Sequence, residues 1–176
     1  LAMLDLVSIQ PGRGTFVRST DCPRLQSSSL EIEIGKEALS ELFEARLIME
    51  VEAAALAAER LTEKNIADFR KVVTRLESST GDDICLFSLK IHQIMAEATQ
   101  NQVIMEILGL IGKRLWAHQR NFYTEELKFQ EIDSHKLLVK ELLSRDPTRA
   151  RTAMITHLHS TIDSMLGGGS AVSEEK

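Results

Sequence analysis

The chain has 176 residues, of which 43% are hydrophobic, so it is long enough to bury one sizeable core. It carries 21 Lys and Arg against 26 Asp and Glu, and the net charge of −5 excludes a general attraction to nucleic acid or to anionic membranes. No apolar run approaches the ~20 residues that a membrane-spanning helix needs. The two cysteines lack metal-type spacing, and no secretory apolar region precedes them, so we expect a cytoplasmic protein.

Residues 1–34 differ in character from the rest of the chain. Two short β-prone runs flank the turn residues Pro-Gly-Arg-Gly at 11–14, which predicts a β-hairpin within residues 1–18. The polar, serine-rich stretch 19–34 is typical of a linker. Because the chain begins at Leu1 without a Met, we expect that an upstream portion has been removed.

From residue 35 to residue 166 the apolar residues recur at helical spacing, and few residues are aromatic. This pattern predicts an all-α fold, an antiparallel bundle of about six helices with the β-hairpin as an N-terminal remnant. Thr62 and Asp146-Pro147 are typical of helix starts, and the tail 167–176 is expected to be disordered. The expected helices cover residues 36–60, 63–77, 82–100, 102–129, 131–144 and 147–166.

Three histidines lie on the apolar stripes of three different predicted helices: His92, His135 and His157. An imidazole buried without a partner costs about 1–3 kcal/mol, so each of them needs one. Three neutral imidazoles from separate helices could share a metal ion, since imidazole is the commonest metal ligand. Ordinary core histidines with hydrogen bonds explain the pattern equally well, because periodicity does not show that the three side chains converge. No Glu-x-x-His pair occurs, which argues against a di-iron carboxylate bundle.

Four segments resemble one family in the right order. Residues 42–62, mostly within the first predicted helix, have the sequence LFEARLIMEVEAAALAAERLT, and residues 91–101 have IHQIMAEATQN. Residues 134–158 have SHKLLVKELLSRDPTRARTAMITHL. These three are similar to the C-terminal effector domain (FCD domain) of FadR-subfamily transcription regulators in the GntR superfamily. LDLVSIQPGRGTFV at 4–17 looks like the end and wing of the winged helix-turn-helix that precedes this domain.

The resemblance implies a ligand set for a metal. In metal-binding members of the family, three histidines and an Asp four residues before the first histidine hold one divalent ion. His92, His135 and His157 fall on the histidine positions, whereas Ser88 falls on the Asp position. Serine is a neutral and weak ligand, so the affinity for the ion should fall. The expected cofactor is a divalent transition metal, zinc first, with nickel or manganese as alternatives.

Other candidates have roles that the sequence leaves open. By resemblance, Arg46 matches an arginine that holds an effector carboxylate, although a salt bridge to Glu50 one turn on would explain it equally well. Arg114 and His118, one turn apart, could line the polar end of an effector cavity. Arg13 at the hairpin tip could touch DNA as wings do in this family, or be a solvated turn residue.

Together these features predict the ligand-sensing and dimerisation domain of a bacterial transcription regulator, spanning residues 35–166, and not an enzyme. A small carboxylate metabolite would bind at the buried metal and control DNA binding. The expected partners are a second copy of the chain and, for the full-length protein, operator DNA; no membrane is expected, and this chain alone should bind little or no DNA. One alternative is a metal-free helical bundle that binds an acyl-type or other apolar effector. A histidine-ligated metallohydrolase is less favoured, because no motif supplies a general base.

Overall fold

The computed structural model describes residues 7–10, 14–17, 36–119 and 125–166. The chain divides into two compact units, Leu1–Glu33 and Ile34–Lys176, and each is described by itself. In the first unit, strand β1 (Val7–Gln10) pairs antiparallel with strand β2 (Gly14–Val17), with Val7 opposite Val17. The predicted hairpin is therefore present. Its tip residue Arg13, the linker and the C-terminal tail lie outside the described residues.

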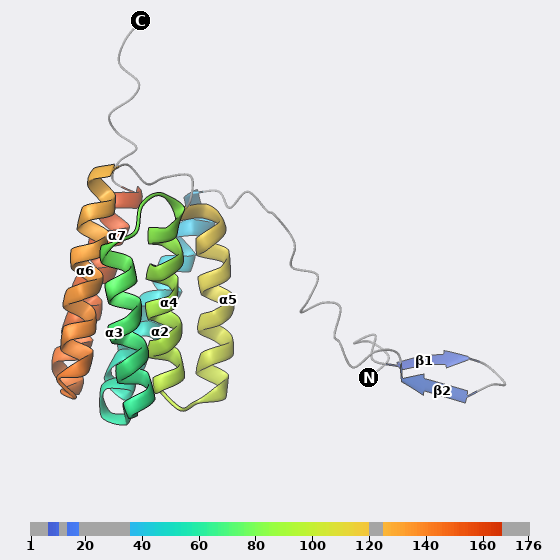
Figure 1. Ribbon diagram of the computed structural model, residues 1–176. Coiled ribbons are helices and arrows are strands. Elements are labelled where there is room, and N and C mark those ends of the chain that lie inside the picture. Colours follow the sequence, from blue (N-terminus) through green and yellow to red (C-terminus); the bar gives the residue numbers. More distant parts are fainter. Residues whose placement is uncertain (1–6, 11–13, 18–35, 120–124, 167–176) are drawn as a thin grey trace, which may run out of the picture. The chain divides into compact units, whose positions relative to one another are not determined.

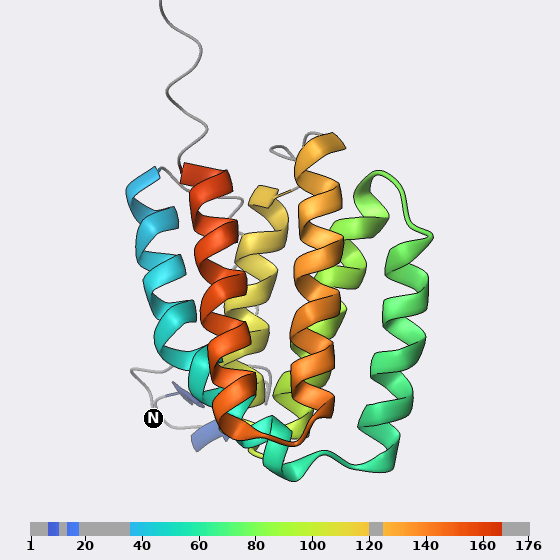
Figure 2. The ribbon, with the colours of Figure 1, turned by 90° about the vertical axis from the view of Figure 1, so that its left-hand side faces the viewer.

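The second unit is an all-α bundle, as predicted (Figure 1). Helix α7 lies between α2 and α6, although α2 is far from both in the sequence (Figure 2). Helix α4 contacts α2, α3, α5 and α6, so side chains on α4 can meet side chains from most of the bundle. The helices are α2 (Lys36–Arg60), α3 (Glu63–Glu77), α4 (Asp82–Ala98), α5 (Gln102–Gln119), α6 (Glu125–Leu143) and α7 (Pro147–Leu166).

Side-chain caps fix two of the helix starts that the sequence predicts. The hydroxyl of Thr62 accepts a hydrogen bond from the backbone N–H of Asn65, and the Asn65 side chain accepts one from the backbone N–H of Thr62. This capping box satisfies donors that the first turn of α3 would otherwise leave unpaired. The carboxylate of Asp146 accepts from the backbone N–H groups of Thr148 and Arg149 at the start of α7.

The prediction of one helix over 102–129 is wrong. Helix α5 ends at Gln119, and Glu125–Phe129 belongs to the next helix, α6, which therefore begins before residue 131. An apolar stripe at 3–4 spacing cannot distinguish one long helix from two helices in tandem.

Four small residues let α2 pack closely within the bundle. Ala53, Ala54, Ala57 and Ala58 are all buried in this single chain, and α2 packs along α7. These alanines therefore pack against other helices of the same chain, and their side chains are not exposed for contact with another molecule. None of the described helices combines the length and the hydropathy that crossing a membrane requires.

Candidate metal centre

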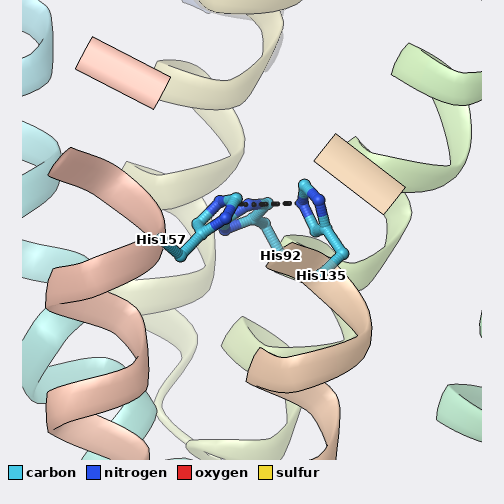
Figure 3. A group of neighbouring side chains, drawn as sticks. All are labelled: His92, His135 and His157. Carbon is cyan, nitrogen blue, oxygen red and sulfur yellow. Dashed lines mark hydrogen bonds between the residues drawn. The ribbon is translucent and has the colours of Figure 1, made fainter. Parts of the chain in front are cut away.

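The three histidines converge in the interior of the bundle. His92 comes from α4, His135 from α6 and His157 from α7, and their rings meet at one point (Figure 3). Nε2 of His92 lies 3.2 Å from Nε2 of His135 and 3.2 Å from Nε2 of His157. One nitrogen from each ring lies within 4.8 Å of the others. The tertiary structure thus brings together three side chains whose convergence the sequence could not establish.

The second nitrogen of each ring, Nδ1, has a partner outside the histidine cluster. Nδ1 of His135 donates to the backbone carbonyl of Glu131 at 2.8 Å, which requires the proton to be on Nδ1. Nδ1 of His92 lies 2.7 Å from a carboxylate oxygen of Glu50, and Nδ1 of His157 lies 2.8 Å from the hydroxyl of Ser134. Such partners are typical of metal-binding histidines, because they fix the tautomer and the ring orientation. The Nε2 lone pairs then face one another.

The separations of the nitrogens suit a shared cation. Metal–nitrogen bonds of about 2.0–2.1 Å in a tetrahedral arrangement place two ligating nitrogens about 3.3–3.4 Å apart. The observed 3.2 Å between Nε2 atoms is close to that spacing. Three lone pairs facing one another repel unless a proton or a cation lies between them. The donor set therefore fits a divalent transition metal, and the site could hold one.

Burial keeps two of the rings neutral. Both His135 and His157 are buried. Burial, together with the neighbouring His92, lowers the pKa of His135 to about 3. Burial and the neighbouring histidines hold the pKa of His157 well below its usual value. Neutral imidazole is the form that binds metal, so neither ring has to lose a proton first near neutral pH.

Arg46 and Glu50 form a buried ion pair beside His92. Nε and Nη2 of Arg46 contact the two carboxylate oxygens of Glu50 at 2.7 and 3.2 Å. Burial raises the pKa of Glu50, but the charge of Arg46 and the hydrogen bonds from Arg46 and His92 outweigh it, and the pKa lies well below its usual value. Nη2 of Arg46 also lies 3.2 Å from Nε2 of His92. A metal ion at Nε2 would take the lone pair to which this N–H points.

A cavity of about 140 Å³ opens beside the histidines. Its polar wall includes Arg46, Glu50, Ser88, His92 and Glu131. Ser88 is buried, and its hydroxyl has no hydrogen-bond partner among the described residues. The lining residues from α5 are apolar or glycine: Met105, Leu108, Gly109, Gly112 and Leu115. The cavity thus has polar lining residues, among them His92 of the histidine cluster, and apolar lining residues from α5.

The remaining predicted site residues either do not line the cavity or lie outside the residues that the structure describes. Arg114 is exposed on α5 and does not line this cavity. The side chain of His118 and all of Arg13 lie outside the described residues, so their roles stay predictions.

Three residues of the site were not predicted from the sequence as members of it. Glu50, Glu131 and Ser134 hold the histidine rings or line the cavity. The spacing of two of them could have indicated a contact, because residues four apart on a helix are neighbours. Glu50 lies four residues after Arg46, and Glu131 lies four residues before His135. Ser134 precedes His135 directly, and only the packing of α6 against α7 brings it to His157.

Residues 41–160, more than half of the chain, match the FCD domain family. The chain belongs to the FCD family of GntR-type transcription regulators. Among curated relatives, this FCD protein is 22% identical to the HTH-type transcriptional regulator LutR of Bacillus subtilis, over 95% of this chain and 80% of LutR. It is 28% identical to the Exu regulon transcriptional regulator of Escherichia coli, over 88% of this chain and 62% of that protein.

Solved structures share the fold of this FCD protein. Streptococcus agalactiae GntR superposes with a TM-score of 0.68 at 24% identity, over 93% of this chain and 77% of that one. E. coli McbR/YncC gives a TM-score of 0.65 at 17% identity, over 96% of this chain and 80% of the other. The curated relatives of the FCD protein are transcription regulators, which confirms the prediction that it is not an enzyme.

Proposed function

We propose that this FCD domain senses a small organic acid at a divalent metal held by His92, His135 and His157. Binding would shift the equilibrium between two arrangements of the full-length regulator and so change its affinity for operator DNA. One observation carries the proposal: three Nε2 atoms from three helices converge while every Nδ1 has a partner. Zinc is the first candidate, with nickel or manganese as alternatives.

The position of the cavity supports an effector beside the metal. His92 belongs both to the histidine cluster and to the cavity wall, so a ligand in the cavity lies next to the ion. Arg46 lines the same wall with a guanidinium that is already paired with Glu50. In this proposal Arg46 attracts an anionic ligand while Glu50 keeps the guanidinium in place.

Direct metal titration tests the proposal. Isothermal titration with Zn²⁺ after removal of bound metal should give one site per chain, and the site should be lost in His135→Ala and in His157→Ala. His159→Ala is the matched control, because His159 is exposed on the same helix as His157 and should leave zinc binding unchanged. Equal zinc affinity in all four proteins would overturn the proposal.

In an alternative function the cavity binds an effector without a metal ion. The apolar wall from α5 favours a metal-free bundle that binds an acyl-type or other apolar effector. In that case elemental analysis would find no transition metal, even after loading, and short-chain fatty acids would raise the melting temperature of the wild type and of His135→Ala alike.

We also propose that the domain forms a homodimer, as the family resemblance implies. Val103, Ile107 and Leu110 expose apolar side chains on one face of α5, at spacings of three and four residues. A contiguous apolar stripe on a helix is typical of a surface that another helix covers. A second copy of the chain would cover this face.

A further inference from the structure

An open groove lies on the surface of the bundle between α3 and α6, two helices that contact each other (Figure 1). Its volume is about 690 Å³, and it shares no lining residue with the cavity beside the histidines. Four of its lining residues are apolar: Val73 from α3, and Leu137, Val139 and Leu143 from α6. Leu137 is 46% exposed, so water contacts apolar surface that a partner would cover. The groove is therefore a surface separate from the candidate metal centre.

The charged residues that line the groove are all cations. Arg70 lines it from α3, Lys136 and Lys140 line it from α6, and none of the described lining residues is acidic. The whole chain has the opposite balance, with 26 Asp and Glu against 21 Lys and Arg. A cluster of one sign creates a local potential that attracts the opposite charge, even on a protein whose net charge has the other sign. The complementary partner is therefore anionic.

Two of the three cations are available to a partner. Lys136 forms an ion pair with Glu77, with 2.7 Å between Nζ and a carboxylate oxygen. In the part of the chain that the structure describes, no carboxylate forms an ion pair with Arg70 or Lys140, and both side chains are exposed. A carboxylate from another molecule would pair with them without breaking an existing ion pair.

The spacing of the lining residues gives the groove a direction and a length. Lys136, Lys140 and Leu143 are four and three residues apart on α6, so they lie on one face of this helix over about two turns, or ~10 Å. Arg70 and Val73 are three residues apart on α3 and face the same groove. A helix of about two to three turns has the matching length, and such a helix enters a groove by an apolar stripe at three- and four-residue spacing.

We infer that this groove is the docking site for an acidic amphipathic helix of a partner protein. The apolar stripe of that helix covers Val73 and Leu137, and carboxylates beside the stripe pair with Arg70 and Lys140. A nucleic acid fits the groove less well, because phosphate contacts dominate such binding and the apolar lining residues offer none. The inference goes beyond the proposed function, since this docking needs neither the metal nor the effector and adds a protein partner to the regulator.

Peptide binding measured by fluorescence anisotropy on the full chain tests the inference. The probes are labelled synthetic peptides of about three helical turns, with leucines at spacings of three and four and glutamates on both sides of the leucines. At least one of them should bind saturably to the wild type, and the same peptides with lysine in place of glutamate should not bind. The double variant Arg70→Glu/Lys140→Glu should weaken the affinity about tenfold, because repulsion replaces attraction at both cations.

Matched variants distinguish the groove from other surfaces. Lys113→Glu/Arg114→Glu reverses two exposed cations on α5 that do not line the groove, so it should bind the peptide as the wild type does. Leu137→Glu should bind the peptide more weakly, because it places a carboxylate among the apolar lining residues. Ile107→Glu is the control for that change, since Ile107 is an exposed apolar residue on α5, and its peptide affinity should equal that of the wild type.

Four outcomes would contradict the inference. The first is binding of no acidic peptide, and the second is equal peptide affinity in the wild type and in both groove variants. Loss of the wild-type oligomeric state in Leu137→Glu would assign the groove to a second copy of the chain. Duplex DNA that displaces the peptide, and whose binding Arg70→Glu/Lys140→Glu abolishes, would assign it to a nucleic acid. Should the groove variants fail to fold by circular dichroism, the wild type decides, because a peptide affinity unchanged between about 0.05 M and about 0.5 M NaCl contradicts pairing of exposed charges.

Discussion

A carboxylate oxygen of Glu50 lies 2.7 Å from Nδ1 of His92, and this contact joins helices α2 and α4 at the candidate metal centre. The ionised carboxylate accepts the Nδ1 proton, which leaves the lone pair of Nε2 free for a metal ion and raises the basicity of Nε2. The same carboxylate holds Arg46 at the cavity wall. Glu50 therefore links the orientation of the His92 ring to the position of the Arg46 guanidinium at the cavity wall.

Replacing Glu50 with Gln should weaken zinc binding about 10–100-fold, the range typical for loss of a partner that orients a metal-binding histidine. Competition with a chromophoric chelator measures the change. Glu52→Gln is the control, because Glu52 is exposed on the same helix and pairs only with Arg151 in the described structure. A zinc affinity equal to that of the wild type in Glu50→Gln would mean that Glu50 does not act on His92.

Without metal, the protein should lose stability as the pH falls. The folded-state pKa of His135 is about 3, below the ordinary value of 6.5 that we assign to the unfolded chain, so the unfolded chain binds more protons between these values. The stability that neutral His135 contributes is fully present above pH 6.5 and is lost as the pH falls toward 3. Urea unfolding in EDTA between pH 7 and pH 5 should show this loss. His135→Ala should show a shallower dependence than His159→Ala, and equal slopes would contradict the assignment.

The two cavity glycines of α5 should respond differently to alanine. Gly109→Ala adds a methyl group that meets nothing within 4 Å, and a mid-helix Gly→Ala change stabilises by up to about 1 kcal/mol. It should keep zinc affinity and reduce the binding of lactate more than that of formate, because it takes up cavity space. In Gly112→Ala the new Cβ would lie 2.7 Å from Cδ1 of Leu89, so this side chain must shift. Thermal melts and anion titrations compare the two, and a loss of zinc binding in Gly109→Ala would contradict the placement of the effector.

A charged side chain among the exposed apolar residues of α5 should dissociate the proposed dimer. Ile107→Glu places a carboxylate in the middle of the stripe formed with Val103 and Leu110, where burial against a second copy would be costly. Sedimentation velocity should show monomers at concentrations where the wild type is dimeric. Leu137→Glu on α6, an equally exposed apolar position away from the stripe, should remain dimeric. The reverse result would place the interface on α6.

Much of the fold is encoded locally. The start of α3 follows from Thr62 and Asn65, and the start of α7 from Asp146 and Pro147, because capping uses side chains within three residues of the backbone groups they satisfy. Apolar spacing placed the three histidines on inward faces, since the helical period alone decides which residues share a face. The ordered motifs also identified the family, which the match over residues 41–160 confirms. The break between α5 and α6 was missed, because the apolar stripe continues across it.

The site itself depends on contacts between helices. Whether His92, His135 and His157 face one point is decided by the rotation and height of α4, α6 and α7 relative to one another, which no local pattern specifies. The partners of their Nδ1 atoms and the unpartnered hydroxyl of Ser88 follow from the same packing. The sequence by itself determined the all-α class, most of the helices, the family and the candidate ligands. Only the tertiary structure decided that the three histidines converge, because contacts between side chains from separate helices are a property of the packed bundle.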